Sequence, residues 1–224
     1  MNLKNHFRHN PDFKIIFFVI FLCFLPFSAA AHPHMFFSCT AEFIWEGEKL
    51  KGVYQEWTLD QFFSADIIRA YDRDMDGKFN TAENRDVYNN AFINLRHYYF
   101  YTFIRQGKTR TSPPSVSEFT ASQKNNLLVY RFYVDLTQFD SSQELFIAVY
   151  DYTFFCDIAY PEKDPIRLVH NSSIVHPKYE IVENKNFPVY YNPIGAIDDT
   201  TIYYEWKPGL QTYYPREIRI YYEK

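Results

Sequence analysis

An acidic segment, residues 72–83, restricts the fold of this chain more tightly than any other part of its sequence. It reads DRDMDGKFNTAE and matches the pattern D-x-[DN]-x-[DN]-G, five further residues and Glu at every defined position. Carboxylates crowded into one short loop repel one another unless a cation lies between them. The oxygen ligands and the closing Glu favour calcium over magnesium. The sequence therefore predicts a calcium site, with these residues as ligands: Asp72, Asp74, Asp76, Lys78 through its carbonyl, Asn80 through water, and Glu83.

Helical patterns flank this segment on both sides. Asp60 is a suitable N-cap, and apolar residues follow it at helical spacing at Phe63, Ile67, Ala70 and Tyr71. After the loop, Val87, Ala91 and Leu95 recur every four residues, with Tyr88 and Phe92 beside them. Residues 60–97 are thus predicted to form an EF-hand-like helix–loop–helix, in which Phe79 points inward. An acidic turn between two helices with no ion is the plainer alternative.

The rest of the chain has the composition of β-strands. Tyr and Phe number 20 and 23, while Gly is limited to 6, a balance that favours pleated, half-buried strands. A hairpin is predicted over 35–57, and further strands over these segments: 98–104, 116–121, 127–136 and 145–160. The fold class predicted is α+β, a mostly antiparallel β-sandwich-like body in a single domain over 32–224. Prolines interrupt its Tyr-rich C-terminal extension, 170–224, where edge strands and loops are predicted, including 202–206 and 218–222.

The N-terminus has the three zones of a secretory signal. Lys4, Arg8 and Lys14 precede an apolar run over 15–27 and then small residues over 28–31. We expect residues 1–31 to be a cleaved signal peptide, cut after Ala31 or one residue earlier, and the remaining chain to be periplasmic. An uncleaved membrane anchor is the alternative.

Cleavage after Ala31 would place two histidines at the new N-terminus. The freed amine and the ring of His32 can chelate a metal, and His34 can assist. Nitrogen donors suit Zn, Cu or Ni rather than calcium. Pro33 has no N–H, which blocks a chelate through consecutive amides. His32 and His34 are thus candidate ligands for a transition metal; a solvated, mobile end is the plain alternative.

Two cysteines remain after such a cut, Cys39 and Cys156. An even number in an oxidising compartment predicts a disulfide between them, and two buried separate thiols are the alternative. With a net charge of -4, we do not expect the chain to bind nucleic acid. No catalytic signature is present, so we do not expect an enzyme.

Four motifs together resemble a bacterial periplasmic family labelled as the periplasmic component of a transport system. They are the AHPH after the signal (31–34), WTLDQFFS (57–64), the acidic loop, and YDYTFF (150–155). The family is found alongside nickel/cobalt-type permeases, and some members are linked to zinc uptake. The resemblance, over roughly 31–168, implies an accessory protein that captures zinc, or nickel or cobalt, for an inner-membrane permease.

Two other functions fit the same residues. A copper oxidase or monooxygenase would hold copper with the amine and ring of His32 and a third nitrogen from one of three histidines, His97, His170 or His176. A purely structural, calcium-stabilised binding module would need no transition metal at all.

Overall fold

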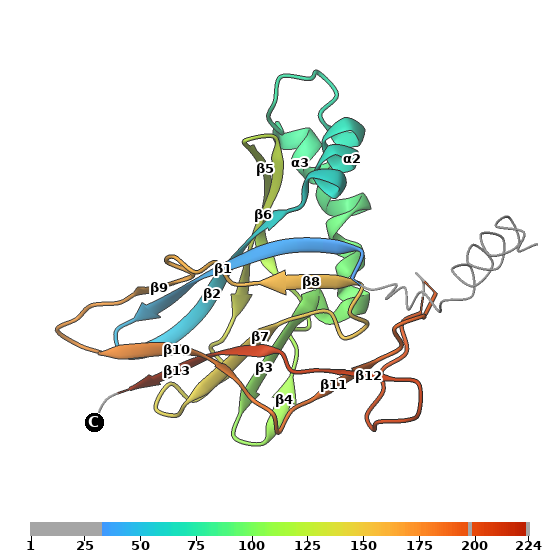
Figure 1. Ribbon diagram of the computed structural model, residues 1–224. Helices are drawn as coiled ribbons and strands as arrows, with labels where there is room; N and C mark the ends of the chain where they lie inside the picture. Colours follow the sequence, from blue (N-terminus) through green and yellow to red (C-terminus); the bar gives the residue numbers. More distant parts are fainter. Residues whose placement is uncertain (1–32, 197–198, 223–224) are drawn as a thin grey trace, which may run out of the picture. The chain divides into compact units, whose positions relative to one another are not determined.

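The computed structural model describes residues 33–196 and 199–222, which form mostly β-strands with a short helical segment (Figure 1). The predicted signal peptide and His32 lie outside these residues. In chain order the elements are β1 (Met35–Glu46), β2 (Lys49–Leu59), α2 (Gln61–Tyr71), α3 (Thr81–Asn90), the 3-10 helix η1 (Phe92–Tyr101), β3 (Thr102–Gln106), β4 (Thr109–Thr111), β5 (Ser117–Lys124), β6 (Leu127–Asp135), β7 (Leu145–Val149), β8 (Cys156–Ala159), β9 (Ile166–Val169), β10 (Pro177–Glu183), β11 (Val189–Tyr191), β12 (Gln211–Tyr213) and β13 (Arg216–Tyr222).

The first sheet is built on the predicted hairpin. Its strand order is β5-β6-β2-β1-β8, and β9 also pairs with β1. β1 and β2 are antiparallel, with Phe37 opposite Leu59, and Gly47 takes a φ of +61° at the turn that joins them. β8 and β9 run parallel to β1, whereas β2, β6 and β5 alternate in direction.

The second sheet has the order β10-β13-β7-β3-β4, with all neighbours antiparallel. β13 lies between β10 and β7, so the prediction of only edge strands and loops after residue 170 is wrong for 216–222. Ile218 and Ile220 are fully buried, which accounts for the interior position. The strand predicted over 202–206 is also wrong, because that segment makes an isolated bridge from Tyr203 to Tyr190.

One hydrophobic core draws side chains from both sheets. Trp57 on β2 is 1% exposed, and its ring meets the ring of Phe132 edge-on at 4.8 Å. Gln55, fully buried beside it, accepts from the Trp57 indole N–H (3.0 Å) and donates to Thr102 Oγ1 on β3 (2.9 Å), so a polar contact joins the sheets inside the core. The fold is mostly β, and most of its strand pairs are antiparallel, as the sequence predicts.

The second helix is shorter than its sequence pattern predicts. α3 ends at Asn90, and η1 follows, with left-handed backbone at Tyr99 and Phe100 (φ +57° and +48°). Phe92, Phe100 and Tyr101 are buried in the core, and this burial overrides the four-residue repeat. The predicted strand over 98–104 accordingly begins only at Thr102. None of the helices in the described ranges combines the length and apolar composition that crossing a lipid bilayer requires.

The strand predicted over 145–160 is interrupted by a turn at 150–155. Asp151 organises this turn: Oδ1 accepts from the Thr153 N–H (2.9 Å) and hydroxyl (2.8 Å), and Oδ2 accepts from the Cys156 N–H (3.1 Å). Such local bonds from an aspartate to the backbone compete with strand pairing. β7 and β8 therefore belong to different sheets.

The two cysteines do not form the predicted disulfide. Both are buried free thiols. Cys156 lies opposite Met35 on β1, and Cys39 is four residues further along that strand, roughly 13 Å away at about 3.3 Å per residue. A disulfide needs Cα atoms within about 7 Å, so the strand register keeps the two residues apart.

Candidate metal centre in the acidic loop

The acidic loop joins two helices, each of which has a side-chain cap at its N-terminus. Asp60 caps α2, since its Oδ1 accepts from the N–H groups of Phe62 (2.9 Å) and Phe63 (3.0 Å). Asn80 caps α3 in a capping box with Glu83. The loop therefore starts at the last turn of α2, where the Asp72 N–H donates to the Ile68 carbonyl (2.9 Å), and ends at the capped first turn of α3.

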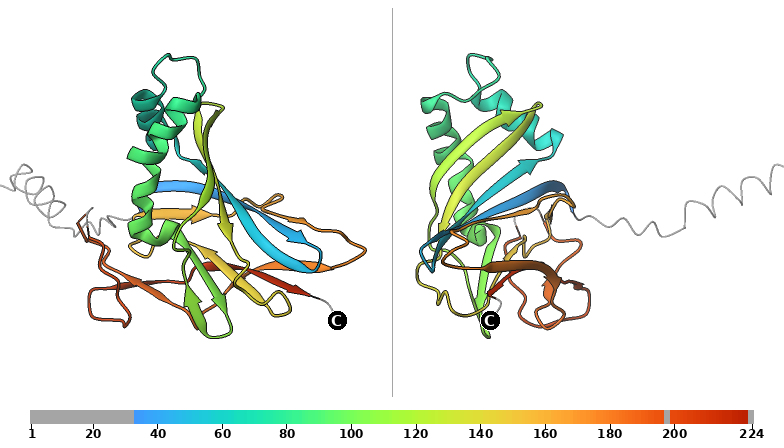
Figure 2. Two further views of the ribbon diagram at one scale, coloured as in Figure 1. Left: turned by 180° about the vertical axis from the view of Figure 1, so that it is seen from behind. Right: turned by 90° about the vertical axis from the view of Figure 1, so that its left-hand side faces the viewer.

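Hydrogen bonds of two side chains, Ser64 and Asn84, attach these helices to the first sheet. Ser64 on α2 is fully buried; its hydroxyl donates to the Leu59 carbonyl (3.2 Å) and accepts from the Leu128 N–H (2.9 Å). Asn84 on α3 accepts from the Ala121 N–H at 2.6 Å. Viewed from behind, α2 and α3 lie together beside β5 and β6 (Figure 2).

Three carboxylates meet inside the loop. Oxygens of Asp72, Asp74 and Asp76 all lie within 4.8 Å of one another. Among residues 33–196 and 199–222, this is the group of three or more His, Cys, Asp or Glu side chains that is close enough to hold an ion. The structure thus brings together three of the six residues predicted from the loop pattern.

Asp72 has one satisfied oxygen and one that lacks a partner. The residue is 6% exposed, and its Oδ2 accepts from Gly77 N–H (3.1 Å) and from the Gln123 side-chain amide (2.8 Å). Its Oδ1 is buried and has no hydrogen-bond partner within the described part of the chain. The Gln123 amide is the main cause that lowers the Asp72 pKa, so the group stays ionised. A buried, unpaired anionic oxygen is costly, and a hard cation would satisfy it.

The other predicted ligands have structural contacts of their own. Both carboxylate oxygens of Glu83 accept hydrogen bonds from the backbone: Oε1 from the Arg73 N–H (2.8 Å) and Oε2 from the Asn80 N–H (3.0 Å). The Asn80 Oδ1 accepts from two backbone N–H groups of α3. Lys78 is exposed, and its N–H donates to Asp76 Oδ1 at 2.8 Å. A carboxylate oxygen can accept more than one bond, so these three residues remain predicted ligands that the structure does not gather around the triad.

Two details of the loop agree with the prediction from the sequence, and a third could not have been predicted. Gly77 has a φ of +80°, which provides the sharp turn, and Phe79 packs partly buried against the core as predicted. Gln123, which fixes the Asp72 carboxylate, is 51 residues away along the chain. No spacing rule connects these two positions.

Of the two candidate N-terminal ligands, the structure describes His34. It is exposed at the start of β1, its N–H donates to the Phe155 carbonyl (2.8 Å), and its ring lies 5.0 Å from the Phe155 ring. The first described residues are thus held at the turn 150–155. His32 immediately precedes them in sequence, outside the described residues.

The copper alternative predicts a third nitrogen ligand from one of three histidines, whose positions can be compared with that of His34: His97, His170 or His176. The His170 ring meets Trp45, eleven residues further along β1 and more than about 30 Å away at strand spacing. His176 lines a cavity beside the β1–β2 turn, at that same far end. His97 is exposed, and its Nε2 accepts from the Arg96 guanidinium at 3.3 Å. His170 and His176 are therefore too far away to complete a copper site with His34.

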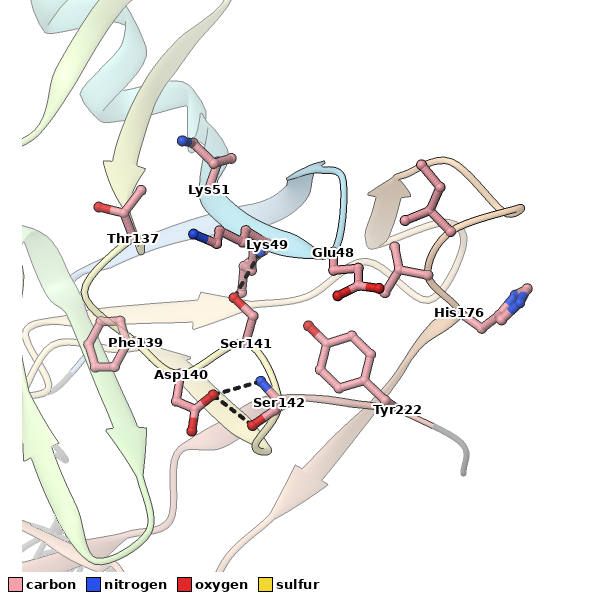
Figure 3. A pocket seen from close by; sticks show the side chains of 13 residues that line it. Glu48, Lys49, Lys51, Thr137, Phe139, Asp140, Ser141, Ser142, His176 and Tyr222 are labelled. Carbon is pink, nitrogen blue, oxygen red and sulfur yellow. Dashed lines mark hydrogen bonds between the residues drawn. The ribbon is translucent and has the colours of Figure 1, made fainter.

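His176 lines a cavity of about 730 Å³ (Figure 3). Several of its polar groups form hydrogen bonds with one another. The Ser141 Oγ accepts from the Leu50 backbone N–H (3.0 Å), and the Ser142 hydroxyl donates to Asp140 (2.7 Å). Figure 3 shows Glu48 and Lys49 among the lining side chains, near Tyr222 and Ser141, and the His176 ring turned away from them. No charged group of this cavity is buried and unpaired in the described ranges, so the acidic loop remains the stronger candidate.

Two curated relatives are similar to this chain. An uncharacterized 15.5 kDa protein encoded in the trpE 3' region of Spirochaeta aurantia is 31% identical over 103 residues, 46% of this chain and 74% of the relative. An uncharacterized protein of Haemophilus influenzae is 25% identical over 147 residues, 64% of this chain and 69% of the relative. A protein-family model matches residues 17–222, nearly the whole chain. The chain therefore belongs to the DUF1007 family of proteins of unknown function.

Proposed function

We propose that this protein is a periplasmic, non-enzymatic accessory protein that captures zinc, or nickel or cobalt, and assists its uptake through an inner-membrane permease. In this proposal a calcium ion in an EF-hand-like loop braces the fold, and His32 and His34 bind the cargo. Contact with the membrane occurs only through the permease, and nucleic acid is not a partner. The observation that carries the metal-binding role is the buried Asp72 Oδ1, unpaired in the described chain, beside Asp74 and Asp76.

Calcium suits this loop because its donors are oxygens and its shape is adaptable. Calcium accepts six to eight oxygen ligands in an irregular shell. The carboxylates of Asp72, Asp74 and Asp76, which already lie close together, would be the first of these ligands. Lys78, Asn80 and Glu83 would complete the shell after a small adjustment. Because Asp72 accepts a hydrogen bond from Gln123 on β5, an ion bound by Asp72 would also connect the helices to the first sheet.

His34 suits a cargo site because it lies exposed immediately before the first strand, β1, and directly after Pro33, the first described residue. His34 is exposed, yet its backbone is bonded to the turn 150–155. Two imidazoles and a terminal amine give at most three nitrogen ligands, which leaves a coordination position open. An incompletely coordinated metal can be passed to another protein more readily than one in a closed site.

Calorimetric calcium titration of the exported protein tests the brace. We expect Asp72→Asn to weaken calcium binding by about tenfold or more, since affinity in such loops follows the ligand charge. Asp140→Asn is the matched control, because Asp140, like Asp72, accepts a hydrogen bond from a backbone N–H of its own loop (that of Ser142), but lies in a different loop. Equal calcium affinity in wild type and Asp72→Asn would contradict the proposed site.

Zinc titration tests the cargo site separately. The His32→Ala/His34→Ala variant should lose the tightest zinc site while its thermal unfolding stays unchanged. His97→Ala/His176→Ala is the control, since both of these histidines are exposed. Mass analysis of the exported protein shows whether His32 becomes the N-terminus. If the first variant binds zinc as wild type does, the cargo role is lost and a calcium-stabilised module remains.

A further inference from the structure

A second cavity, of about 190 Å³, lies where the helices meet the first sheet. Phe37 and Trp57 come from β1 and β2, Phe63 comes from α2, and Phe92 and Leu95 come from η1. Tyr130 on β6 and Asp151 in the turn 150–155 also line it. Its wall is thus mainly aromatic, with a few polar groups.

The cavity is larger than an ordinary packing defect. Protein interiors contain few voids bigger than a water molecule, and an apolar cavity of about 150 Å³ is known to stay dry and accept a benzene ring. The volume here therefore suits one six-membered ring with a small substituent. Aromatic walls favour an aromatic occupant through edge-to-face and offset contacts.

Two polar groups of the wall indicate the chemistry of that occupant. Tyr130 is 2% exposed, and its hydroxyl is buried without a hydrogen-bond partner in the described part of the chain. Asp151 is 1% exposed, and its oxygens accept from Thr153 and Cys156 only at the turn. An apolar, buried wall penalises an anionic ligand and a cationic ligand alike, because either must lose its water. A neutral ligand with a hydroxyl group fits both constraints.

We propose that this cavity is a binding site for a small neutral aromatic molecule that carries one hydroxyl group. The ring occupies the space between Trp57, Phe63 and Phe92, and its hydroxyl bonds to the polar part of the wall at Tyr130 or Asp151. This site is separate from the proposed metal sites, so it stands or falls independently of them.

Isothermal titration with phenol, toluene and benzoate tests the site on the full exported protein. We expect saturable binding of one phenol per chain, weaker binding of toluene, which lacks the hydroxyl, and no measurable binding of benzoate. Ala91 lines the cavity, so Ala91→Phe should fill it and weaken phenol binding by at least about tenfold. Ala70→Phe is the matched control, because Ala70 lies exposed on α2 outside the cavity, and it should bind phenol as wild type does.

Two results would overturn the proposal: absence of saturable phenol binding to wild type, or equal binding by Ala91→Phe and Ala70→Phe. If Ala91→Phe does not fold, as judged by circular dichroism, Leu95→Phe fills the same space from η1 and the same outcomes apply. Tyr130→Phe removes a single hydroxyl and should reduce the preference for phenol over toluene. An unchanged preference in both Tyr130→Phe and Asp151→Asn would contradict the polar contact.

Discussion

Asp72 and Asp151 are both buried, yet their surroundings shift their pKa values in opposite directions. Hydrogen bonds, first of all from Gln123, lower the pKa of Asp72. Burial raises the pKa of Asp151, although Thr153 and Cys156 donate to it. The ionised form is therefore favoured at Asp72 and disfavoured at Asp151, and the two residues oppose each other in the pH dependence of stability.

The Asp151 contribution can be isolated by substitution. An acid whose pKa is raised on folding binds more protons in the folded state, so stability falls as pH rises from the unfolded value near 3.8 through the raised folded value. The unfolding free energy of wild type minus that of Asp151→Asn should therefore decrease over this window, by about 1.4 kcal/mol for each unit of the pKa shift. Urea unfolding at a series of pH values from 4 to about 7 measures it. A difference that is constant with pH would contradict the assignment.

At the scale of elements, a buried ion pair joins β3 to β13 in the second sheet across the intervening β7. Arg105 is bidentate to Glu217, at 3.1 and 2.7 Å, and both residues are almost fully buried. Arg110 lies 3.7 Å from the same carboxylate, and Asn184 donates to it at 3.3 Å. One carboxylate thus balances two guanidinium groups inside the protein.

Removal of that carboxylate charge should be costly. Glu217→Gln leaves Arg105 buried without its counter-ion, and we expect a loss of about 3–5 kcal/mol in unfolding free energy, as measured by urea denaturation. Glu42→Gln is the control, because Glu42 pairs with Arg167 at the surface (2.9 Å) and should lose at most about 1 kcal/mol. Similar losses in the two variants would show that the pair does not anchor β13.

Local chemistry explains which elements could be predicted from the sequence. The β1–β2 hairpin, the Asp60 cap and the glycine turn of the acidic loop depend on neighbouring residues, and the sequence predicts all three. The end of α3 and the interruption of the predicted strand at Asp151 depend on what each segment packs against. The sequence patterns around Phe100 and Tyr152 therefore predict a helix and a strand that are longer than those in the structure. Gln123 and the register that separates the cysteines are non-local, and no pattern in one sequence reveals them.

At the scale of the whole molecule, the free thiols distinguish this fold from a disulfide-stabilised one. Burial raises the pKa values of both Cys39 and Cys156 well above the ordinary range, so neither forms a thiolate readily. A reductant should therefore leave the melting temperature of the protein unchanged. After unfolding in guanidinium, a thiol reagent should titrate both cysteines without prior reduction. A melting temperature that falls with reductant would show that the two residues pair after all.

The acidic loop lies between β2 of the first sheet and the η1–β3 segment that enters the second. If the loop binds calcium as proposed, loss of the ion would leave three carboxylates repelling one another at the point where Asp72 is hydrogen-bonded to Gln123 on β5. The attachment of the helices to the first sheet would then weaken before the sheets themselves, which take no part in that repulsion.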